Sequence, residues 1–246
     1  QVEFPITWAL DRSQFKEVLY KGYESGRKPS EVSGLPRLYY DRNKPFEKMI
    51  KIFNYFPIKN SVTKPTAYII PQGWWKVTDL LKLNKVQMRQ LKKDTSIKVE
   101  VYKIEDYKTL PRQYEMHHLN TEVKTSSSLR MVKFSKGDWY IPLNQVANRF
   151  LVETLEPMGE DSYFAWNYFD AVLGQKEGYS AYAFEDIAAD YLKNNAELRS
   201  KLEQRKATDT AFAKNGRAQL NFIYQNSPWY EPAHNQYPVY RVMNGE

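Results

Sequence analysis

The spacing of apolar residues changes along this chain of 246 residues, and the change constrains the fold more than any other feature. Ile97, Val99 and Val101 alternate with polar residues, which is the period of a half-buried strand. From residue 183 to residue 192, apolar residues recur three and four positions apart, which is the period of a helix. Separate segments with these two periods predict an α+β fold.

For residues 1–65 we predict a β-rich, sandwich-like segment. Glycine and proline residues separate three apolar and aromatic clusters, which lie at residues 4–10, 35–40 and 49–56. The stretch from Gly22 to Gly34 predicts a long loop between two of these strands.

For residues 66–157 we predict a mixed α/β unit. A short buried strand over residues 66–70 precedes a helix in which Trp74, Val77 and Leu81 share one face. The serine-rich residues 125–128 lie between two strand-like stretches and predict the turn of a hairpin.

For residues 158–246 we predict a helical segment, beginning near residue 161, and an irregular tail packed on the body. Phe164 and Tyr168 fall on one helical face, and further apolar stripes follow. The sequence leaves open whether residues 66–246 form a single domain. No run approaches the roughly 20 apolar residues of a membrane span, so we expect no transmembrane segment.

The formal net charge of +7 is compatible with an acidic partner, but most basic residues are interleaved with acidic ones. Such a pattern is typical of a solvated surface, and we do not expect the chain to bind nucleic acid. The chain has no cysteine, which excludes disulfides, thiol catalysis and thiolate metal sites.

Histidine is the first residue to consider for a metal or a general base, and the chain has only His117, His118 and His234. No carboxylate follows them at the spacing of a metal motif, and neighbouring side chains in an extended segment point to opposite sides. Phosphate-binding loops of the Gly-Lys-Ser/Thr type are absent from the sequence. We therefore expect no catalytic residue, no metal site and no cofactor in this chain.

Aromatic residues make up 15% of the chain, and they supply the candidate binding residues. If some are exposed, they can stack on sugars, hold a peptide or cover a partner domain. Trp74 and Trp75 are adjacent on one helix and cannot both face inward, so one of them is expected to be exposed. The candidates are Trp74, Trp75, Trp139, Tyr140, Trp229 and Tyr230.

Several strings in the chain are distinctive in combination: Pro71-Gln-Gly-Trp74, Tyr140-Ile-Pro-Leu-Asn-Gln145, Leu155-Glu-Pro157, Trp166-Asn-Tyr-Phe-Asp170 and Tyr230-Glu-Pro232. In these strings the chain resembles the C-terminal region of large secreted bacterial zinc carboxypeptidases of the carboxypeptidase A-like family. The resemblance is strongest from about residue 64 to residue 240. The family's His-x-x-Glu zinc motif belongs to an upstream catalytic domain and does not occur here.

The resemblance implies a non-catalytic accessory region of a secreted or periplasmic protein. Its partner would be its own upstream catalytic domain, which would hold zinc and remove C-terminal residues from peptides. No catalytic residue of the family can be assigned to a position in this chain. An accessory region of this kind predicts an apolar surface that is exposed in the isolated chain.

Two alternatives remain open at this stage. The chain could be a binding module for carbohydrate or cell-wall peptide, in which case exposed aromatic residues would line its ligand site. It could also be a small independent hydrolase, which would require a histidine and acidic residues to converge in the fold.

Overall fold

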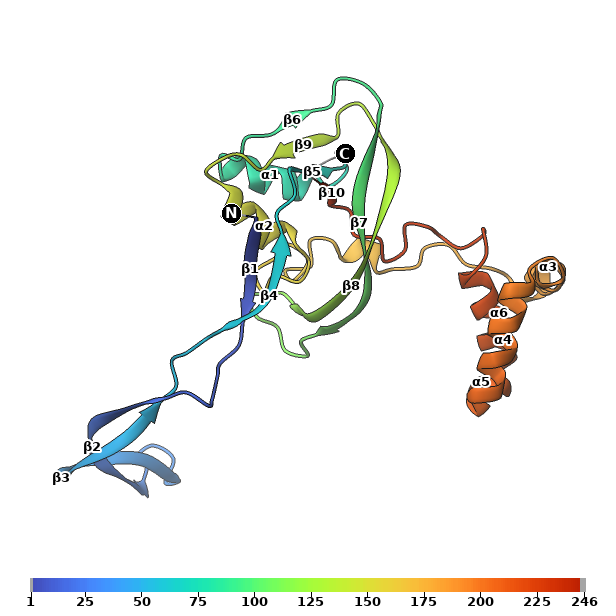
Figure 1. Ribbon diagram of the computed structural model, residues 1–246. Helices are drawn as coiled ribbons and strands as arrows, with labels where there is room; N and C mark the ends of the chain where they lie inside the picture. Colours follow the sequence, from blue (N-terminus) through green and yellow to red (C-terminus); the bar gives the residue numbers. More distant parts are fainter. Residues whose placement is uncertain (1, 244–246) are drawn as a thin grey trace. The chain divides into compact units, whose positions relative to one another are not determined.

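The computed structural model describes residues 2–243, and the chain divides into two compact units, Gln1–Thr63 and Lys64–Glu246 (Figure 1). The predicted α+β class is confirmed. Two-stranded sheets form the N-terminal unit, a six-stranded antiparallel sheet with helices follows, and a further helical segment lies toward the C-terminus.

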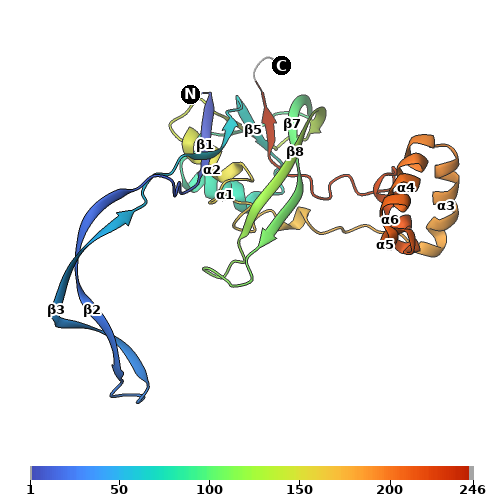
Figure 2. The same cartoon turned by 60° about the horizontal axis from the view of Figure 1, so that its bottom comes forward.

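The first unit consists of two antiparallel strand pairs. β1 (Glu3–Trp8) pairs with β4 (Ile58–Thr63), and β2 (Lys16–Pro29) pairs with β3 (Pro36–Ile52). Instead of the two packed sheets of a sandwich, these strands form two separate two-stranded sheets. We call the β2–β3 pair the ribbon; its long, twisted course is visible in Figure 2.

The long loop predicted from Gly22 to Gly34 is wrong, because β2 continues to Pro29 and the turn occupies only the residues before Pro36. Aromatic rings from β3 explain the glycines within the strand. A Cβ atom on Gly22 would lie 3.0 Å from the Phe46 ring, and one on Gly26 would lie 2.8 Å from the Tyr39 ring. The glycines therefore make room for rings that cover the strand, as glycine permits where another group approaches the backbone closely.

The second unit contains a six-stranded antiparallel sheet with the strand order β6-β9-β5-β10-β7-β8. Its strands are β5 (Ala67–Ile70), β6 (Arg89–Gln90), β7 (Thr95–Thr109), β8 (Asn120–Phe134), β9 (Trp139–Pro142) and β10 (Tyr240–Val242). Ile69, Val99, Val101, Phe134 and Tyr240 belong to one buried cluster on this sheet. The last strand in sequence therefore lies in the interior of the sheet, between β5 and β7.

The hairpin turn predicted at residues 125–128 is wrong. β8 runs without interruption from Asn120 to Phe134, and Ser126 and Ser128 pair with Lys103 and Val101 of β7. The serines are tolerated because this part of β8 is exposed and forms an edge of the sheet, where polar side chains can face water. Ser126 Oγ donates a hydrogen bond of 2.6 Å to Glu105 on β7.

Two helices belong to the sheet region of the second unit. α1 (Trp75–Leu83) buries Val77 and Leu81, two of the residues predicted to share a face. α2 (Asn148–Leu155) buries Leu151, Val152 and Leu155. Residues 158–169, in contrast, form consecutive turns followed by a short 3-10 helix, η1 (Asp170–Val172), where a regular helix was expected.

Asn167 explains part of that difference. Its φ angle of 67° lies in the left-handed region, which a right-handed helix cannot accommodate. Phe164 and Tyr168, which were predicted to share a helical face, differ in burial: Phe164 is fully buried together with Phe169, whereas Tyr168 is half-buried.

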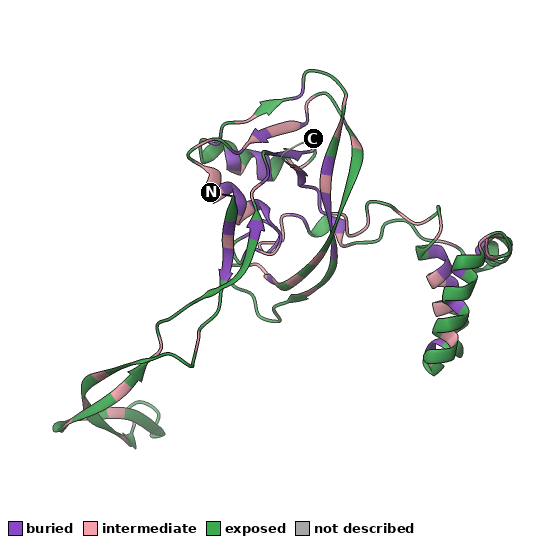
Figure 3. Ribbon diagram, viewed as in Figure 1, coloured by how far each residue is buried: buried purple, intermediate pink, exposed green. Residues whose placement is uncertain are grey.

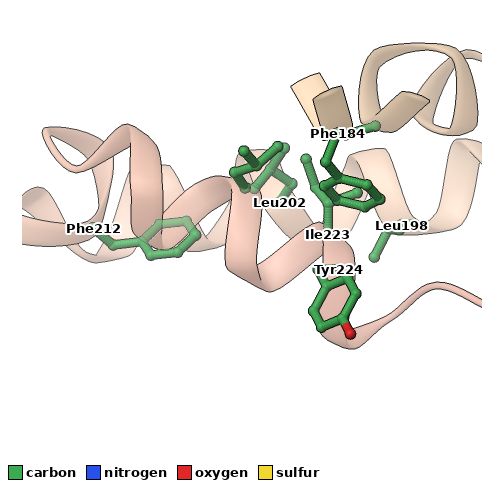
Figure 4. Packing of buried hydrophobic residues seen from close by; sticks show 8 residues of the cluster. Phe184, Leu198, Leu202, Phe212, Ile223 and Tyr224 are labelled. Carbon is green, nitrogen blue, oxygen red and sulfur yellow. The ribbon is translucent and has the colours of Figure 1, made fainter. Parts of the chain in front are cut away.

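The C-terminal helices are α3 (Ala181–Lys193), α4 (Ala196–Thr208), α5 (Thr210–Ala213) and α6 (Gly216–Gln225). Their apolar faces meet in a cluster that includes Phe184, Leu202, Phe212 and Ile223 (Figure 4). Side-chain oxygens cap three of the helices: Asn195, Asp209 and Asn215 each accept a hydrogen bond from a backbone amide in the first turn. These helices therefore have a core and end signals of their own.

Candidate interaction surfaces

The predicted pair Trp74 and Trp75 lies at the start of α1, with one residue facing inward and one outward. Trp74 is half-buried, and its ring meets the Phe169 ring edge-on at a centroid distance of 5.0 Å. Trp75 is 59% exposed. It borders a shallow depression together with Lys76, Asp79, Leu80, Leu83 and Tyr168.

Trp139 and Tyr140 lie on β9 and are half-buried. Each ring is covered by a cation from the same chain: Lys82 Nζ lies 4.8 Å from the Trp139 ring, and the Arg89 guanidinium lies 4.3 Å from the Tyr140 ring. These cation–π contacts stabilise the sheet region and occupy one face of each ring.

Trp229 and Tyr230 pack against the C-terminal helices. Trp229 is 48% exposed, and its ring contacts those of Phe184 and Tyr191 edge-on. Tyr230 is half-buried, and its hydroxyl is hydrogen-bonded to His234 Nδ1. The six predicted binding residues thus form three separate sets of contacts, and Trp75 and Trp229 are the members with large exposed rings.

A group of rings that the sequence analysis did not single out as a site joins the loop at residues 110–118 to the turns at residues 162–169. The His117 ring lies 5.5 Å from the Trp166 ring and 6.3 Å from the Tyr168 ring, and Trp166 lies 6.1 Å from Tyr114. Tyr168 also borders the depression beside Trp75. The density of aromatic residues from 163 to 169 was the available signal, but the spacing of Phe164 and Tyr168 suggested one face of a helix.

The histidines have partners within their own chain. His117 Nδ1 lies 3.3 Å from Asn167 Oδ1, and His118 Nδ1 lies 2.9 Å from the Leu110 carbonyl oxygen. Asn167 in turn donates a 2.9 Å hydrogen bond to the His118 carbonyl. This exchange holds the loop against the turns and keeps Asn167 in its left-handed conformation.

A carboxylate lies next to this ring group. Asn120 donates a hydrogen bond of 2.8 Å to Asp170 and another of 3.2 Å to the Phe164 carbonyl. Partial burial raises the pKa of Asp170, while the hydrogen bonds from Asn120 and Asn167 oppose the rise. The arrangement fixes Asp170 in place. No group of three or more histidine, aspartate or glutamate side chains within residues 2–243 could hold a metal ion.

A buried group of charged and hydroxyl side chains lies in the core of the second unit. Glu156, at the end of α2, is fully buried and accepts a 2.6 Å hydrogen bond from the Tyr68 hydroxyl. Arg241 Nε lies 3.0 Å from the same carboxylate, and the Arg241 guanidinium also contacts Glu100 and Tyr102. Burial raises the pKa of Glu156, and the nearby Arg241 charge opposes that rise. The group links β5, β7, β10 and α2, which is a structural role.

The ribbon exposes many of the large apolar side chains of the first unit. None of residues 16–52 is buried (Figure 3). Its large side chains that are at least two-fifths exposed are Leu19, Tyr20, Tyr23, Val32, Leu35, Leu38, Tyr40, Met49 and Ile52. Because paired residues of antiparallel strands point to the same side, Val18 with Ile50 and Leu19 with Met49 place apolar side chains on both faces.

The ribbon also carries a large share of the chain's charge. Residues 16–52 contain nine basic and five acidic residues, a net charge of +4 out of the chain's +7. Lys21 pairs with Glu47 at 2.6 Å, and Lys44 lies 3.8 Å from Glu24. The surface is therefore both apolar and basic.

None of the helices within residues 2–243 combines the length and the hydrophobicity that a membrane-spanning helix requires. The sequence was also compared with family models, curated proteins and solved structures. It matches no family model, and no curated protein or solved structure is detectably similar to it.

Proposed function

We propose that this chain is a non-catalytic interaction region that packs on a partner domain through the ribbon. The observation that carries the proposal is the exposed apolar surface of β2 and β3. Monomeric soluble proteins rarely expose contiguous apolar patches of large size, and such patches mark sites of association.

The stability of the ribbon supports the same proposal. A hairpin that pairs with no third strand is marginally stable in water, because only one row of hydrogen bonds and a few cross-strand contacts hold it. Within residues 2–243, β2 and β3 pair only with each other. The covering rings at Gly22 and Gly26 and the Lys21–Glu47 ion pair add stability, but the large side chains remain in contact with water. A partner that covers them would supply the missing apolar burial.

The resemblance to the C-terminal region of secreted zinc carboxypeptidases suggests the partner. It would be a catalytic domain encoded upstream in the same protein, with zinc held by that domain and peptides as its substrates. This chain would then stabilise the catalytic domain or shape access to it, and the parent would act outside the cytoplasm. None of the residues in this chain is assigned a catalytic role.

Sequencing the gene upstream of the Gln1 codon is the first test. We expect a signal peptide followed by a domain with His-x-x-Glu and a later histidine. That domain, purified separately, should bind the full chain in a calorimetric titration. It should not bind a variant in which residues 16–52 are replaced by a short Gly-Ser linker. Unchanged binding by the linker variant, or a signal peptide directly before Gln1, would rule out the proposed function.

A second candidate function is favoured by Trp75. Its large exposed ring borders a depression with Tyr168, Lys76 and Asp79, which combines stacking surfaces with hydrogen-bonding groups. Such a site suits a sugar or a cell-wall peptide. Titration with peptidoglycan fragments, followed by tryptophan fluorescence, should show saturable binding that Trp75→Ala abolishes and Trp229→Ala preserves. If both variants bind equally well, this candidate fails.

A further inference from the structure

The ribbon contains a hollow at the point where its register is interrupted. Tyr23 pairs with Pro45, whereas Ser25 pairs with Tyr40, so β3 contains extra residues between these two pairs. A bulge of this kind bends the strands and redirects side chains. The hollow beside it is lined by Tyr20, Lys21, Gly22, Tyr23, Tyr40 and Arg42.

The side chains around this hollow are accessible and are of two chemical types. Tyr20, Tyr23 and Tyr40 are 49%, 46% and 62% exposed. The two cations differ in their partners, since Lys21 pairs with Glu47, whereas Arg42 forms no ion pair with any other residue from 2 to 243. The hollow therefore offers phenol rings together with a guanidinium group that is available to a partner.

These groups define the ligand that would fit. A guanidinium binds a carboxylate through two parallel hydrogen bonds, and aromatic rings beside it bind apolar or aromatic side chains. We propose that this hollow binds an acidic, aromatic-containing segment of the protein partner, with Arg42 contacting the carboxylate and Tyr40 and Tyr23 contacting the neighbouring ring. This assignment rests on the proposed function, because it names the chemistry of the surface that the ribbon would meet.

Charge distribution favours an acidic protein segment over nucleic acid. Glu17, Glu24, Glu31, Asp41 and Glu47 are interleaved with the basic residues of the ribbon. Continuous phosphate backbones are repelled by such interleaved acids, and their binding relies on uniform basic grooves. The exposed Leu19, Met49 and Ile52 also match the mixed apolar and polar character of a protein surface.

The test uses the full chain and a defined probe, a fluorescein-labelled random copolymer of glutamate and tyrosine, with polyglutamate as the comparison. Fluorescence anisotropy should show tighter binding of the copolymer. Arg42→Glu should weaken it by about tenfold or more, the effect of losing one charge-assisted contact. Tyr40→Ala should remove the preference for the copolymer. Arg37→Glu is the matched control, because Arg37 is exposed on the same strand and does not line the hollow.

Three results would overturn the assignment. The first is no binding of the copolymer, and the second is equal weakening by Arg42→Glu and Arg37→Glu, which would indicate attraction by net charge alone. The third is tighter binding of a thymidine oligonucleotide than of the copolymer. Far-ultraviolet circular dichroism of each variant checks that the ribbon is still formed.

The two proposals can fail separately. If the upstream domain binds Arg42→Glu and Tyr40→Ala as tightly as it binds the original chain but does not bind the linker variant, the proposed function stands and the hollow is not the contact. If the linker variant binds the domain normally, the proposed function fails, and the copolymer measurement still decides what the hollow binds.

Discussion

Two long antiparallel hairpins of this protein have similar lengths and very different surroundings. β7 and β8 have 15 residues each, and β2 and β3 have 14 and 17. β7 lies inside the six-stranded sheet and buries Val99, Val101 and Ile104, whereas no residue of the ribbon is buried. Backbone pairing is similar in both, so the difference lies in what covers the side chains. The comparison shows that strand pairing and strand burial are separate requirements, and that the ribbon meets only the first within this chain.

Hydrogen exchange should show the largest difference between the two hairpins. Buried strands exchange through global unfolding, and exposed pairs exchange through local opening. Amides of β7 that face β10 or β8 should exchange slower than those of β2 by roughly three orders of magnitude, given ordinary global stability. Mass spectrometry of peptides from the exchanged chain would measure this. Slow exchange in the ribbon of the isolated chain would mean that the chain covers it, and the partner proposal would lose its basis.

Removal of the buried Glu156 carboxylate should have the next largest effect, a loss of unfolding free energy. Glu156→Ala leaves Arg241 buried with fewer opposite charges, and breaking such a pair costs about 3–5 kcal/mol. Urea unfolding followed by circular dichroism would measure the loss. Glu153→Ala is the control, since Glu153 pairs with Arg149 on the surface of the same helix and should cost about 0.3–0.5 kcal/mol. Equal effects of the two variants would show that Glu156 does not support the sheet region.

A matched pair of isoleucines tests the two hairpins directly. Ile104 of β7 is 1% exposed, and Ile104→Ala should lower the free energy of unfolding by about 2–5 kcal/mol. Ile50 of β3 is half-exposed, and Ile50→Ala should cost less than about 1 kcal/mol. Addition of the partner domain should increase the cost at Ile50 and leave the cost at Ile104 unchanged. A large cost at Ile50 in the isolated chain would contradict the comparison.

The smallest expected effect is a pH dependence of the unfolding free energy, which arises from the region of the six-stranded sheet alone. The pKa of folded Glu156 lies above the ordinary glutamate value of 4.5, so the folded state binds this proton more tightly than the unfolded state. The resulting stabilisation is present in full below that value and is lost as pH rises through the raised pKa. Glu156→Gln cannot titrate and lacks this contribution.

The measurement is the difference in unfolding free energy between the original chain and Glu156→Gln, followed from about pH 4 to about pH 7. The original chain should lose stability relative to the variant as pH rises. A constant or rising difference would show that Glu156 has no raised pKa. Exchange rates in the ribbon should be the same for both proteins after correction for the intrinsic effect of pH.

Local periodicity predicted the elements whose residues contact neighbours along the chain. The alternation of Ile97, Val99 and Val101 gave a strand of the sheet, and the spacing of Val77 and Leu81 gave the inner face of α1. The same reasoning failed in the ribbon at Gly22. From the sequence alone, a strand glycine that is covered by the Phe46 ring of the opposite strand cannot be distinguished from a loop glycine. Predicting β2 therefore requires knowledge of which residues of β3 lie opposite its glycines.

The candidate surfaces were predictable to a smaller extent. Helix geometry required that Trp74 and Trp75 face different ways, and Trp75 is the exposed one. Two features could not be predicted from the sequence, because they join segments that are separated along the chain. They are the contact between Glu156 and Arg241 and the hollow at the ribbon bulge. A bulge depends on which residues pair across the strands, and apolar spacing within one strand does not record it.

β10 is synthesised after every other strand of the six-stranded sheet, although it lies between β5 and β7. Until Tyr240–Val242 emerge, the β5–β9 and β7–β8 fragments each have an inner edge with open backbone hydrogen-bonding groups. Arg241, the cation beside Glu156, arrives with the same three residues. From the completion of β9 until β10 emerges, the nascent chain therefore exposes two sheet edges, which are prone to aggregation.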